Sequence, residues 1–154
     1  MYPYCNLQLE YYSLDSLNIQ ANDAFEPGKY AEFNDHLECD FDFFKKEDEE
    51  RFMMPVSIAV NAGSELTEMI PYSLEIKLTA FFKHDPDINP EAVKFSPPDI
   101  VQNCFMAAYS LARVILDDVT AKSRNGRYLL PLVDVATIMK EKNRRQEEAA
   151  AGEN

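Results

Sequence analysis

Few side chains in this sequence have the types and spacing that catalysis requires. The two histidines, His36 and His84, lie far apart along the chain, one at the start of a predicted strand and the other in a predicted loop beside Asp85 and Asp87. A histidine beside carboxylates can transfer protons or bind a metal ion, but a solvated loop explains the same residues. The acidic run at 85–89 lacks the central glycine and the terminal glutamate of a calcium-binding loop. We therefore expect neither a metal nor a cofactor.

Sequence motifs of common enzyme classes are also missing. The chain has no glycine-rich nucleotide loop, no Gly-x-Ser-x-Gly turn and no Cys-x-x-Cys pair. Asp40 and Asp42 share one face of a predicted strand, as catalytic carboxylates can, but Glu38 shares it too and no nearby group would raise one pKa. The three cysteines are widely spaced and odd in number, which predicts buried apolar residues rather than disulfides. The sequence predicts a protein that is not an enzyme.

The chain is long enough and apolar enough for one folded domain, which we expect over 1–154. Of its 154 residues 46% are hydrophobic, and 27 acidic against 15 basic residues give a net charge of −12. Such a surface repels phosphate groups, which excludes nucleic acid and favours a basic partner. No apolar run approaches the roughly 20 residues that span a bilayer, and the start does not resemble a signal peptide. We expect a cytoplasmic protein without membrane insertion.

Residues 5–83 alternate in the way that strands of a half-buried sheet do. A loop at 22–35 is expected to be pinned to the sheet by its aromatic side chains. Pro55 has no N–H for the ladder, so its strand is expected to be bulged or at a sheet edge. The four predicted strands, the first of them kinked, cover residues 7–21, 37–43, 52–60 and 72–82.

The apolar spacing changes to that of helices in the last third of the chain. A helix start at 96–99 combines a capping hydroxyl, prolines in the first turn and an acid three residues after the cap. A long helix is predicted over 97–123 and a shorter one from Pro131, while 147–154 is expected to fray into an acidic tail. The fold class is therefore α+β, with a four-stranded antiparallel sheet followed by a long and a shorter helix.

The predicted long helix is apolar over more than half of its circumference, which is more than one sheet can cover. A second copy of the chain is the simplest cover, so we expect a homo-oligomer, either a dimer or a tetramer. A charge at Ala112 is expected to break this oligomer before it unfolds the protomer. The predicted interface residues are Phe105, Ala112, Leu116 and Val119.

Met and aromatic residues are numerous for a small acidic domain, with 6 Met, 10 Phe and 8 Tyr. Two interpretations are open: these side chains pack against helices and a second subunit, or some of them line a groove for extended apolar segments. The second interpretation places a groove between the 22–35 loop, the sheet and the long helix. Its candidate client-binding residues are Tyr30, Phe33, Phe81, Phe82 and Met106.

Glu38, Asp40, Asp42 and Glu75 alternate outward from two predicted strands. If these strands are neighbours, the carboxylates lie on one face and create a negative field without catalytic geometry. Solubility explains such a face, and docking of a basic partner is the functional alternative.

The order of the predicted elements, together with four short segments, resembles SecB, the export chaperone, and its SecB-like relatives. Segment 17–22 is similar to the family's first-strand segment, and segment 74–82 is similar to its last strand with the closing aromatic. Segment 111–115 resembles the Ala-Arg region of the family's long helix, and 129–133 resembles the Leu-x-Pro entry to its second helix. The resemblance covers about residues 7–140.

The resemblance implies an assembly and partners as well as a fold. In the family, protomers form a dimer of dimers, hold unfolded clients without ATP and pass them to the SecA motor. At the family's motor-contact positions, Glu75 matches the acid, whereas Gln20 replaces an acid, Ser73 replaces an apolar residue and Asp15 lies upstream. The resemblance therefore makes Asp15, Gln20 and Glu75 the candidate partner-docking residues.

The expected function is ATP-independent holding of extended apolar segments of unfolded proteins or preproteins, for export or for a dedicated client such as an antitoxin. The alternative is an acidic adaptor or scaffold that binds one folded partner. Promiscuity separates the two, because a holdase suppresses the aggregation of several unrelated proteins and an adaptor suppresses none.

Overall fold

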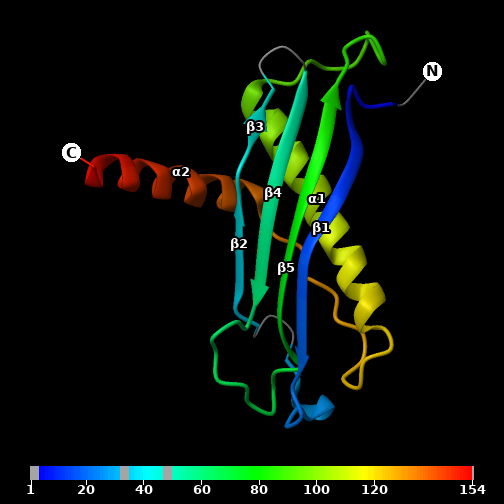
Figure 1. Cartoon of the computed structure of the whole chain (residues 1–154), viewed down its shortest axis with the longest axis vertical. Helices are drawn as coiled ribbons and strands as arrows, with labels where there is room; N and C mark the ends of the chain where they lie inside the picture. The colour runs from blue at the N-terminus through cyan, green and yellow to red at the C-terminus, as the bar shows by residue number, and fades with distance from the viewer. Residues whose placement is uncertain (1–3, 32–34, 47–49, 154) are drawn as a thin grey trace.

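The computed structural model describes residues 4–31, 35–46 and 50–153. An antiparallel sheet precedes two helices (Figure 1), so the predicted α+β architecture is confirmed. The second predicted strand, 37–43, ends earlier, at Phe41, and a further short strand begins at Phe44. The elements are β1 (Leu7–Ala21), a short 3-10 turn (Pro27–Lys29), β2 (Leu37–Phe41), β3 (Phe44–Lys45), β4 (Arg51–Val60), β5 (Tyr72–His84), α1 (Pro97–Thr120) and α2 (Val135–Gly152).

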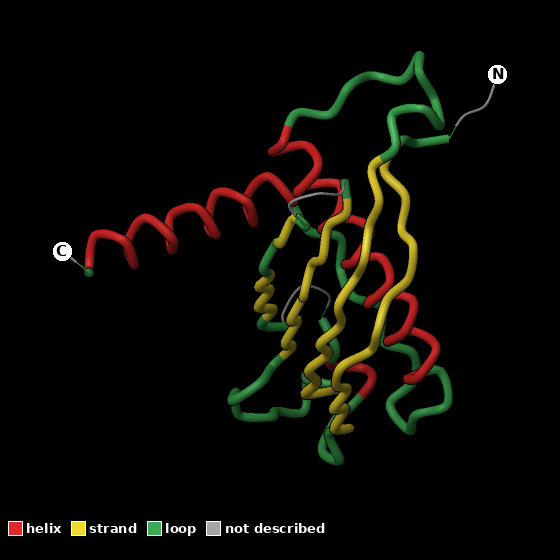
Figure 2. Tube along the Cα trace, turned by 45° about the horizontal axis from the view of Figure 1, so that its top comes forward, coloured by secondary structure: helices red, strands yellow, loops and turns green. Residues whose placement is uncertain are grey.

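The strands follow the order β1-β5-β4-β2 across the sheet, and β3 also pairs with β4. Every pair is antiparallel. α1 crosses one face of the sheet on a diagonal, and α2 projects away beyond the β2 edge (Figures 1 and 2). We call the face of the sheet opposite α1 the outer face.

β1 is a long edge strand with the kink that the sequence predicts. Its register against β5 slips twice, at Glu10 and at Asp15. An extra residue in one strand shifts the alternation of its side chains by one position. Tyr11 consequently faces the outer side with Phe81, while Tyr12 pairs with Ala80 on the α1 side.

Pro55 lies in β4, an interior strand whose register against β5 runs through Pro55 without a shift, so both predicted alternatives, a sheet edge and a bulge, are wrong. The proline instead interrupts the neighbouring strand. The N–H of Asp42 donates to the carbonyl of Pro55 at 3.0 Å, and Pro55 has no N–H with which to return the bond. β2 therefore ends at Phe41, and β3 begins only at Phe44.

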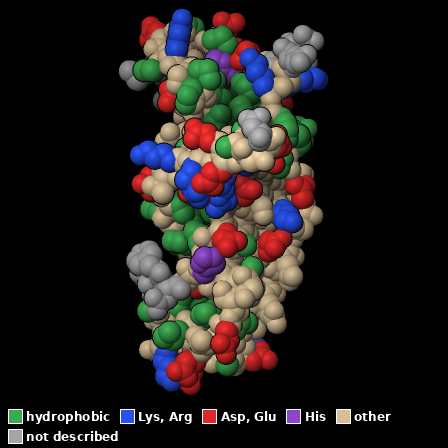
Figure 3. All heavy atoms as spheres, turned by 90° about the vertical axis from the view of Figure 1, so that its left-hand side faces the viewer, with side chains coloured by type: hydrophobic (Ala, Val, Ile, Leu, Met, Phe, Trp, Pro, Cys, Tyr) green, Lys and Arg blue, Asp and Glu red, His purple; other side chains and the backbone are tan. Residues whose placement is uncertain are grey.

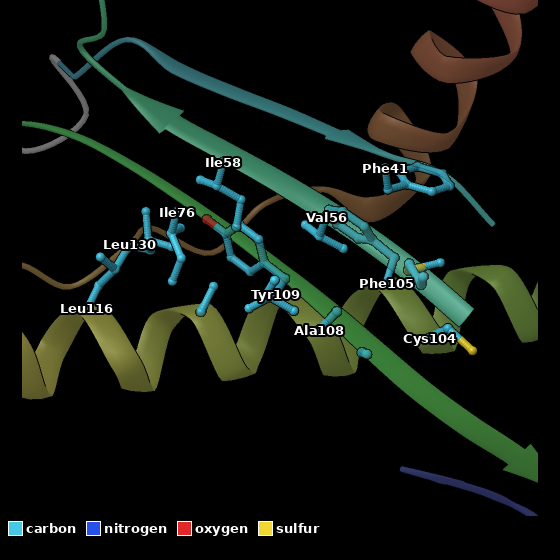
Figure 4. Close-up of a cluster of buried hydrophobic side chains, with 14 of the residues drawn as sticks. Phe41, Val56, Ile58, Ile76, Cys104, Phe105, Ala108, Tyr109, Leu116 and Leu130 are labelled. Carbon is cyan, nitrogen blue, oxygen red and sulfur yellow. The ribbon is translucent and has the colours of Figure 1, made fainter. Parts of the chain in front are cut away.

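The core lies between the sheet and α1 (Figure 4). Every second residue of β4 and β5 points toward the helix and is buried, including Ile58 and Ile76, which are almost fully covered. Phe105 and Leu116 enter this layer from α1. The alternation along the strands therefore specifies which face of the sheet the long helix covers.

Three of the four residues predicted for the subunit interface belong to this core. Phe105, Ala112 and Leu116 have side chains that are 0% exposed, and only Val119, at 48%, is accessible. The sequence shows a helix that is apolar on several sides, but its period does not say which side meets the protomer's own sheet. The interface assignment is corrected accordingly, because side chains buried in the protomer cannot contact a second copy.

The helices differ from prediction at three of their four ends. α1 begins as predicted, with Ser96 and Asp99 forming a capping box, but it ends at Thr120. α2 begins at Val135 rather than at Pro131, because the preceding segment is bonded to α1: the Tyr109 hydroxyl donates to the carbonyl of Pro131 at 2.6 Å. α2 then continues to Gly152, through most of the segment expected to fray. Across the described ranges, neither helix is long and apolar enough to cross a membrane.

Candidate functional site

The structure does not bring the predicted client-binding residues together. Tyr30 lies in the loop at one end of the sheet, whereas Phe81 and Phe82 lie near the opposite end, on β5. Phe81 faces the outer side and Phe82 is buried toward α1, because successive strand residues point to opposite faces. Met106 is exposed on α1, and Phe33 lies outside the described residues. The predicted groove between loop, sheet and long helix is wrong.

Tyr30 belongs to a hydrogen-bond cluster that ties the 22–35 loop to the sheet. The hydroxyls of Tyr30 and Tyr128 donate to the carboxylate of Asp35 at 3.2 and 3.3 Å. The buried amide of Asn61 donates to the same carboxylate at 2.7 Å and to the carbonyl of Tyr72 at 3.0 Å. Burial raises the pKa of Tyr128, and nearby Asp35 raises it further, so this hydroxyl stays a donor. We assign Tyr30 a structural role.

A groove is present instead at the β2 edge, between β2 and α2. Its first hollow has a volume of about 450 Å³. Apolar side chains contributed by β2, by α2 and by the segment before α2 line it, whereas charged side chains stand around them. The apolar lining consists of Leu37, Cys39, Phe41, Val133 and Ile138, and the charged lining includes Glu38, Asp40, Glu141 and Arg145.

A second hollow, of about 560 Å³, continues the first along the same edge. Phe41 and Lys142 line both hollows. Beyond them, the apolar lining comes from Phe43, Phe44 and Met139 and from the start of α1. We call the two hollows together the β2–α2 groove. Figure 3 looks onto this edge and shows acidic and basic side chains meeting at mid-height, with hydrophobic side chains above and below them.

Lys142 bridges the groove at the point where its two hollows meet. Its ammonium lies 2.9 Å from the carboxylate of Asp40, 3.5 Å from that of Asp42 and 5.4 Å from the centre of the Phe41 ring. Burial opposes ionisation of Asp40, but the hydrogen bonds from Lys142 and from the Phe41 amide lower its pKa below the ordinary value. Lys142 therefore holds α2 against β2 through its ion pairs with Asp40 and Asp42 and through its contact with the Phe41 ring.

We expect the Lys142–Asp40 contact to be lost in acid. Because the folded-state pKa of Asp40 is lowered, its contribution to α2 docking is fully present above its ordinary pKa of 3.8 and disappears as the pH falls through the lowered value. Lys142→Met removes the hydrogen bond and the charge that lower the pKa of Asp40, while burial still raises it, so the pKa of Asp40 should rise. An NMR titration of the Asp40 carboxyl carbon measures this, with Lys140→Met, an exposed neighbour on α2, as the control. An unchanged Asp40 pKa in Lys142→Met would contradict the contact.

The groove also runs along an unpaired strand edge. β2 pairs with β4 on one side, and in the part of the chain that the structure describes no strand pairs with its other side. Such an edge presents backbone N–H and C=O groups that can add a further strand. The Phe41 N–H on this edge already donates to the Asp40 carboxylate at 2.9 Å. The β2–α2 groove therefore offers an extended chain apolar surface and the remaining backbone groups of the β2 edge.

The ionisable groups of the groove suit binding rather than catalysis. Burial raises the pKa of the Cys39 thiol to about 11, so it is protonated and unreactive at neutral pH. The guanidinium groups of Arg144 and Arg145 hold the pKa of Glu141 at about 2, so it stays a carboxylate. Within the described ranges, His, Cys, Asp and Glu side chains do not gather in threes that could hold a metal ion.

The candidate partner-docking residues share the outer face of the sheet. The Thr79 hydroxyl, on that face, donates to the carboxylate of Asp15 at 2.6 Å. Gln20 pairs with Ser73, two positions before Glu75 on β5, and residues two apart on a strand share a face. Whether a motor binds there stays a prediction.

Carboxylates of β2 and β5 also lie on this face, although the two strands are not neighbours. Ala59 of β4 pairs with both Glu38 and Glu75, so one strand separates them. The ammonium of Lys77 lies 3.2 Å from the carboxylate of Glu75, and the carboxylate of Asp40 forms an ion pair with Lys142 of α2. Basic side chains therefore offset part of the predicted negative field.

The sequence predicts the strand that contains β2 and a second helix separately, but not the groove that they form. The signal that could have found it is the alternation at Leu37, Cys39 and Phe41, which leaves an apolar row at one strand face. Neither the pattern of the strand nor that of the helix indicates that α2 packs against the β2 edge of the sheet. Lys142 was missed because a lysine in a charged helix carries no distinguishing pattern.

Comparison with known proteins finds similarity in structure alone. No model of a protein family matches the sequence, and no curated protein matches it. The SecB-like chaperone of Mycobacterium tuberculosis, solved in complex with a peptide from the antitoxin HigA1, is 13% identical, with a TM-score of 0.51 over 83% of this chain and 91% of that one. A protein of unknown function from Streptococcus agalactiae is 12% identical, with a TM-score of 0.47 over 82% and 97%. The resemblance noted in the sequence is thus confirmed for the fold: this chain folds as the SecB-like chaperones do.

Proposed function

We propose that this protein is an ATP-independent holdase, not an enzyme, that binds extended apolar segments of unfolded proteins. The observation that carries the proposal is the β2–α2 groove, in which apolar side chains lie along an unpaired strand edge. Residues of a client that point into the groove would bury apolar surface, and its backbone would pair with β2. No step of this binding requires a nucleotide.

The client class follows from what the groove recognises. Backbone pairing is independent of sequence, and aromatic and Met side chains adapt to different apolar partners. The M. tuberculosis protein of the same fold was solved with an antitoxin peptide. This supports an antitoxin-type dedicated client as one form of the function, with export preproteins as the other, in the cytoplasm in both cases.

Promiscuity tests the proposal. The protein should suppress the aggregation of several unrelated unfolding enzymes at near-stoichiometric ratios. Binding of an unfolded client should have a negative heat-capacity change and should survive moderate salt, because apolar burial drives it. If no unfolding enzyme is protected while one folded, basic partner binds, the protein is an acidic adaptor instead. Binding that vanishes at physiological salt would also contradict the groove.

We further propose that the protein is a homo-oligomer assembled through the side of α1 that faces away from the sheet. Met106 and Val114 are 48% and 67% exposed there, with Leu111 and Ile115 partly exposed beside them. Exposed apolar stripes of this kind on a helix are usually covered by another chain. Among the residues predicted from sequence only Val119 is exposed, but five residues after Val114 it lies roughly 140° around α1 and outside this stripe.

Light scattering tests this assembly. The protein should have a mass that is a multiple of 17.7 kDa at micromolar concentration, and Val114→Asp should shift it toward 17.7 kDa by placing a charge in the apolar contact. Lys122→Asp, at an exposed position in the loop after α1, controls for the added acid. A wild-type protein that is a stable 17.7 kDa monomer would refute the proposal.

A further inference from the structure

A row of large apolar side chains crosses the outer face of the sheet at the end nearest His84. In the strand register Phe44 pairs with Met53, Met53 with Phe81, and Phe81 with Tyr11. The rings of Tyr11 and Phe81 stack with their centres 4.3 Å apart. Phe44 and Tyr11, at the two ends, are 51% and 57% exposed. We call Phe44, Met53, Phe81 and Tyr11 the aromatic row.

The aromatic row is narrow and, apart from Pro55 next to Met53, is bounded by polar side chains. The next positions on one side include Ser13 and Thr79, and those on the other side include Arg51 and Lys83. Three strand spacings of about 4.8 Å give the row a length of roughly 14 Å. A band one side chain wide offers much less than the roughly 800 Å² per partner that a stable protein interface buries. An extended chain of about 4–5 residues fits this shape better than a folded partner or a second copy does.

The aromatic row is continuous with the β2–α2 groove. A hollow of about 370 Å³ lies over the row, and Phe44 and Phe81 are part of its lining. Phe44 also lines the second hollow of the groove. Phe44 therefore connects the groove, around the edge formed by β3, with the hollow on the outer face. Charged side chains, among them Glu10 and Arg51, line the border of that hollow.

We propose that the aromatic row is a second contact for the same client chain. A segment that leaves the β2–α2 groove passes Phe44, turns over the sheet edge and places about five further residues along the row. The inference rests on the proposed function, because it requires a client in the groove. It defines the preferred clients as unfolded segments with two apolar clusters, one for the groove and one for the row, rather than as single short motifs.

Two synthetic peptides test the proposal on the full-length protein. The first, of roughly 8 residues, matches the length of the groove from Leu37 to Phe44, and the second adds roughly 6 residues with two aromatic side chains. In the wild type the long peptide should bind at least tenfold more tightly than the short one, as measured by fluorescence anisotropy. Tyr11→Ser should remove most of this gain and leave the short peptide unaffected.

Tyr12→Ser is the matched control, because Tyr12 is the next residue on β1, is 45% exposed and faces the α1 side. This variant should keep the full gain. Phe44→Ser is a second test variant, since it cuts the row at the point where it meets the groove, and circular dichroism verifies the fold of each protein. Equal affinities of the two peptides for the wild type, or a gain kept by both test variants, would overturn the aromatic row and leave the groove in place. If neither peptide binds to the wild type, the proposed function fails and takes this inference with it.

Discussion

Ala112→Asp is expected to destabilise the protomer strongly. The Ala112 side chain is 0% exposed and lies in the layer between α1 and the sheet, where a carboxylate would have neither a cation nor water to bind. Leaving a buried charge uncompensated costs roughly 3–5 kcal/mol. Domains of this size have about 5–15 kcal/mol of stability in total, so a large part of it should be lost.

Urea unfolding followed by circular dichroism measures this loss. Ser110→Asp is the matched control, because it places the same charge two residues earlier at an exposed position of α1. Exposed substitutions of this kind change stability by about 0.5 kcal/mol or less. If Ala112→Asp unfolds at the same urea concentration as the wild type but is a monomer, the interface that the sequence predicts is correct after all.

Ile138→Ser is expected to cost most of the client affinity. Ile138 lines the first hollow of the β2–α2 groove from the α2 side and is partly exposed there. Full burial of an exposed aliphatic side chain contributes about 1.5–3 kcal/mol. Ile138 is already partly buried, so its loss should weaken the Kd by roughly 10-fold. Lys140→Ser, on the same helix but outside the groove lining, should bind as the wild type does.

Alkylation of Cys39 gives a second measurement of the same prediction. Cys39 lies in the groove, so in alkaline buffer, where part of this thiol is deprotonated, a bound client should slow its reaction with iodoacetamide in the wild type and should protect it less in Ile138→Ser. Cys5 is exposed outside the groove and should react at the same rate throughout. If Ile138→Ser holds clients with wild-type affinity, the client binds elsewhere on the protein.

The fold could be predicted from the sequence because its signals are local. Alternation of side chains specifies the buried face of β4 and β5, and the cap at Ser96 specifies where α1 begins. The position of Pro55 was wrong because strand order depends on pairing between distant segments. The start of α2 was wrong because Pro131 is a favourable first helical residue, yet tertiary hydrogen bonds hold it outside the helix.

The candidate site was harder to predict, because it is made by the approach of two separate elements. The sequence predicts one groove for Phe81 and Phe82, whereas they point to opposite faces of β5. A pair of neighbouring aromatics signals large apolar surface without saying which surface stays open. Exposure is decided by the diagonal path of α1 and by the return of α2 to β2, and neither is encoded in a short pattern.

The sheet order has a consequence for how many clients one assembly can hold. β5 and β4 separate the β1 edge from the β2 edge, and three strand spacings put these edges roughly 14 Å apart. The groove belongs to the β2 edge, and the stripe proposed for assembly belongs to the far side of α1. Copies joined through α1 would each keep an open groove, so valency would grow with copy number. A long unfolded chain caught by one protomer would then meet the neighbouring grooves at high effective concentration, and its residence time would exceed that of a single groove.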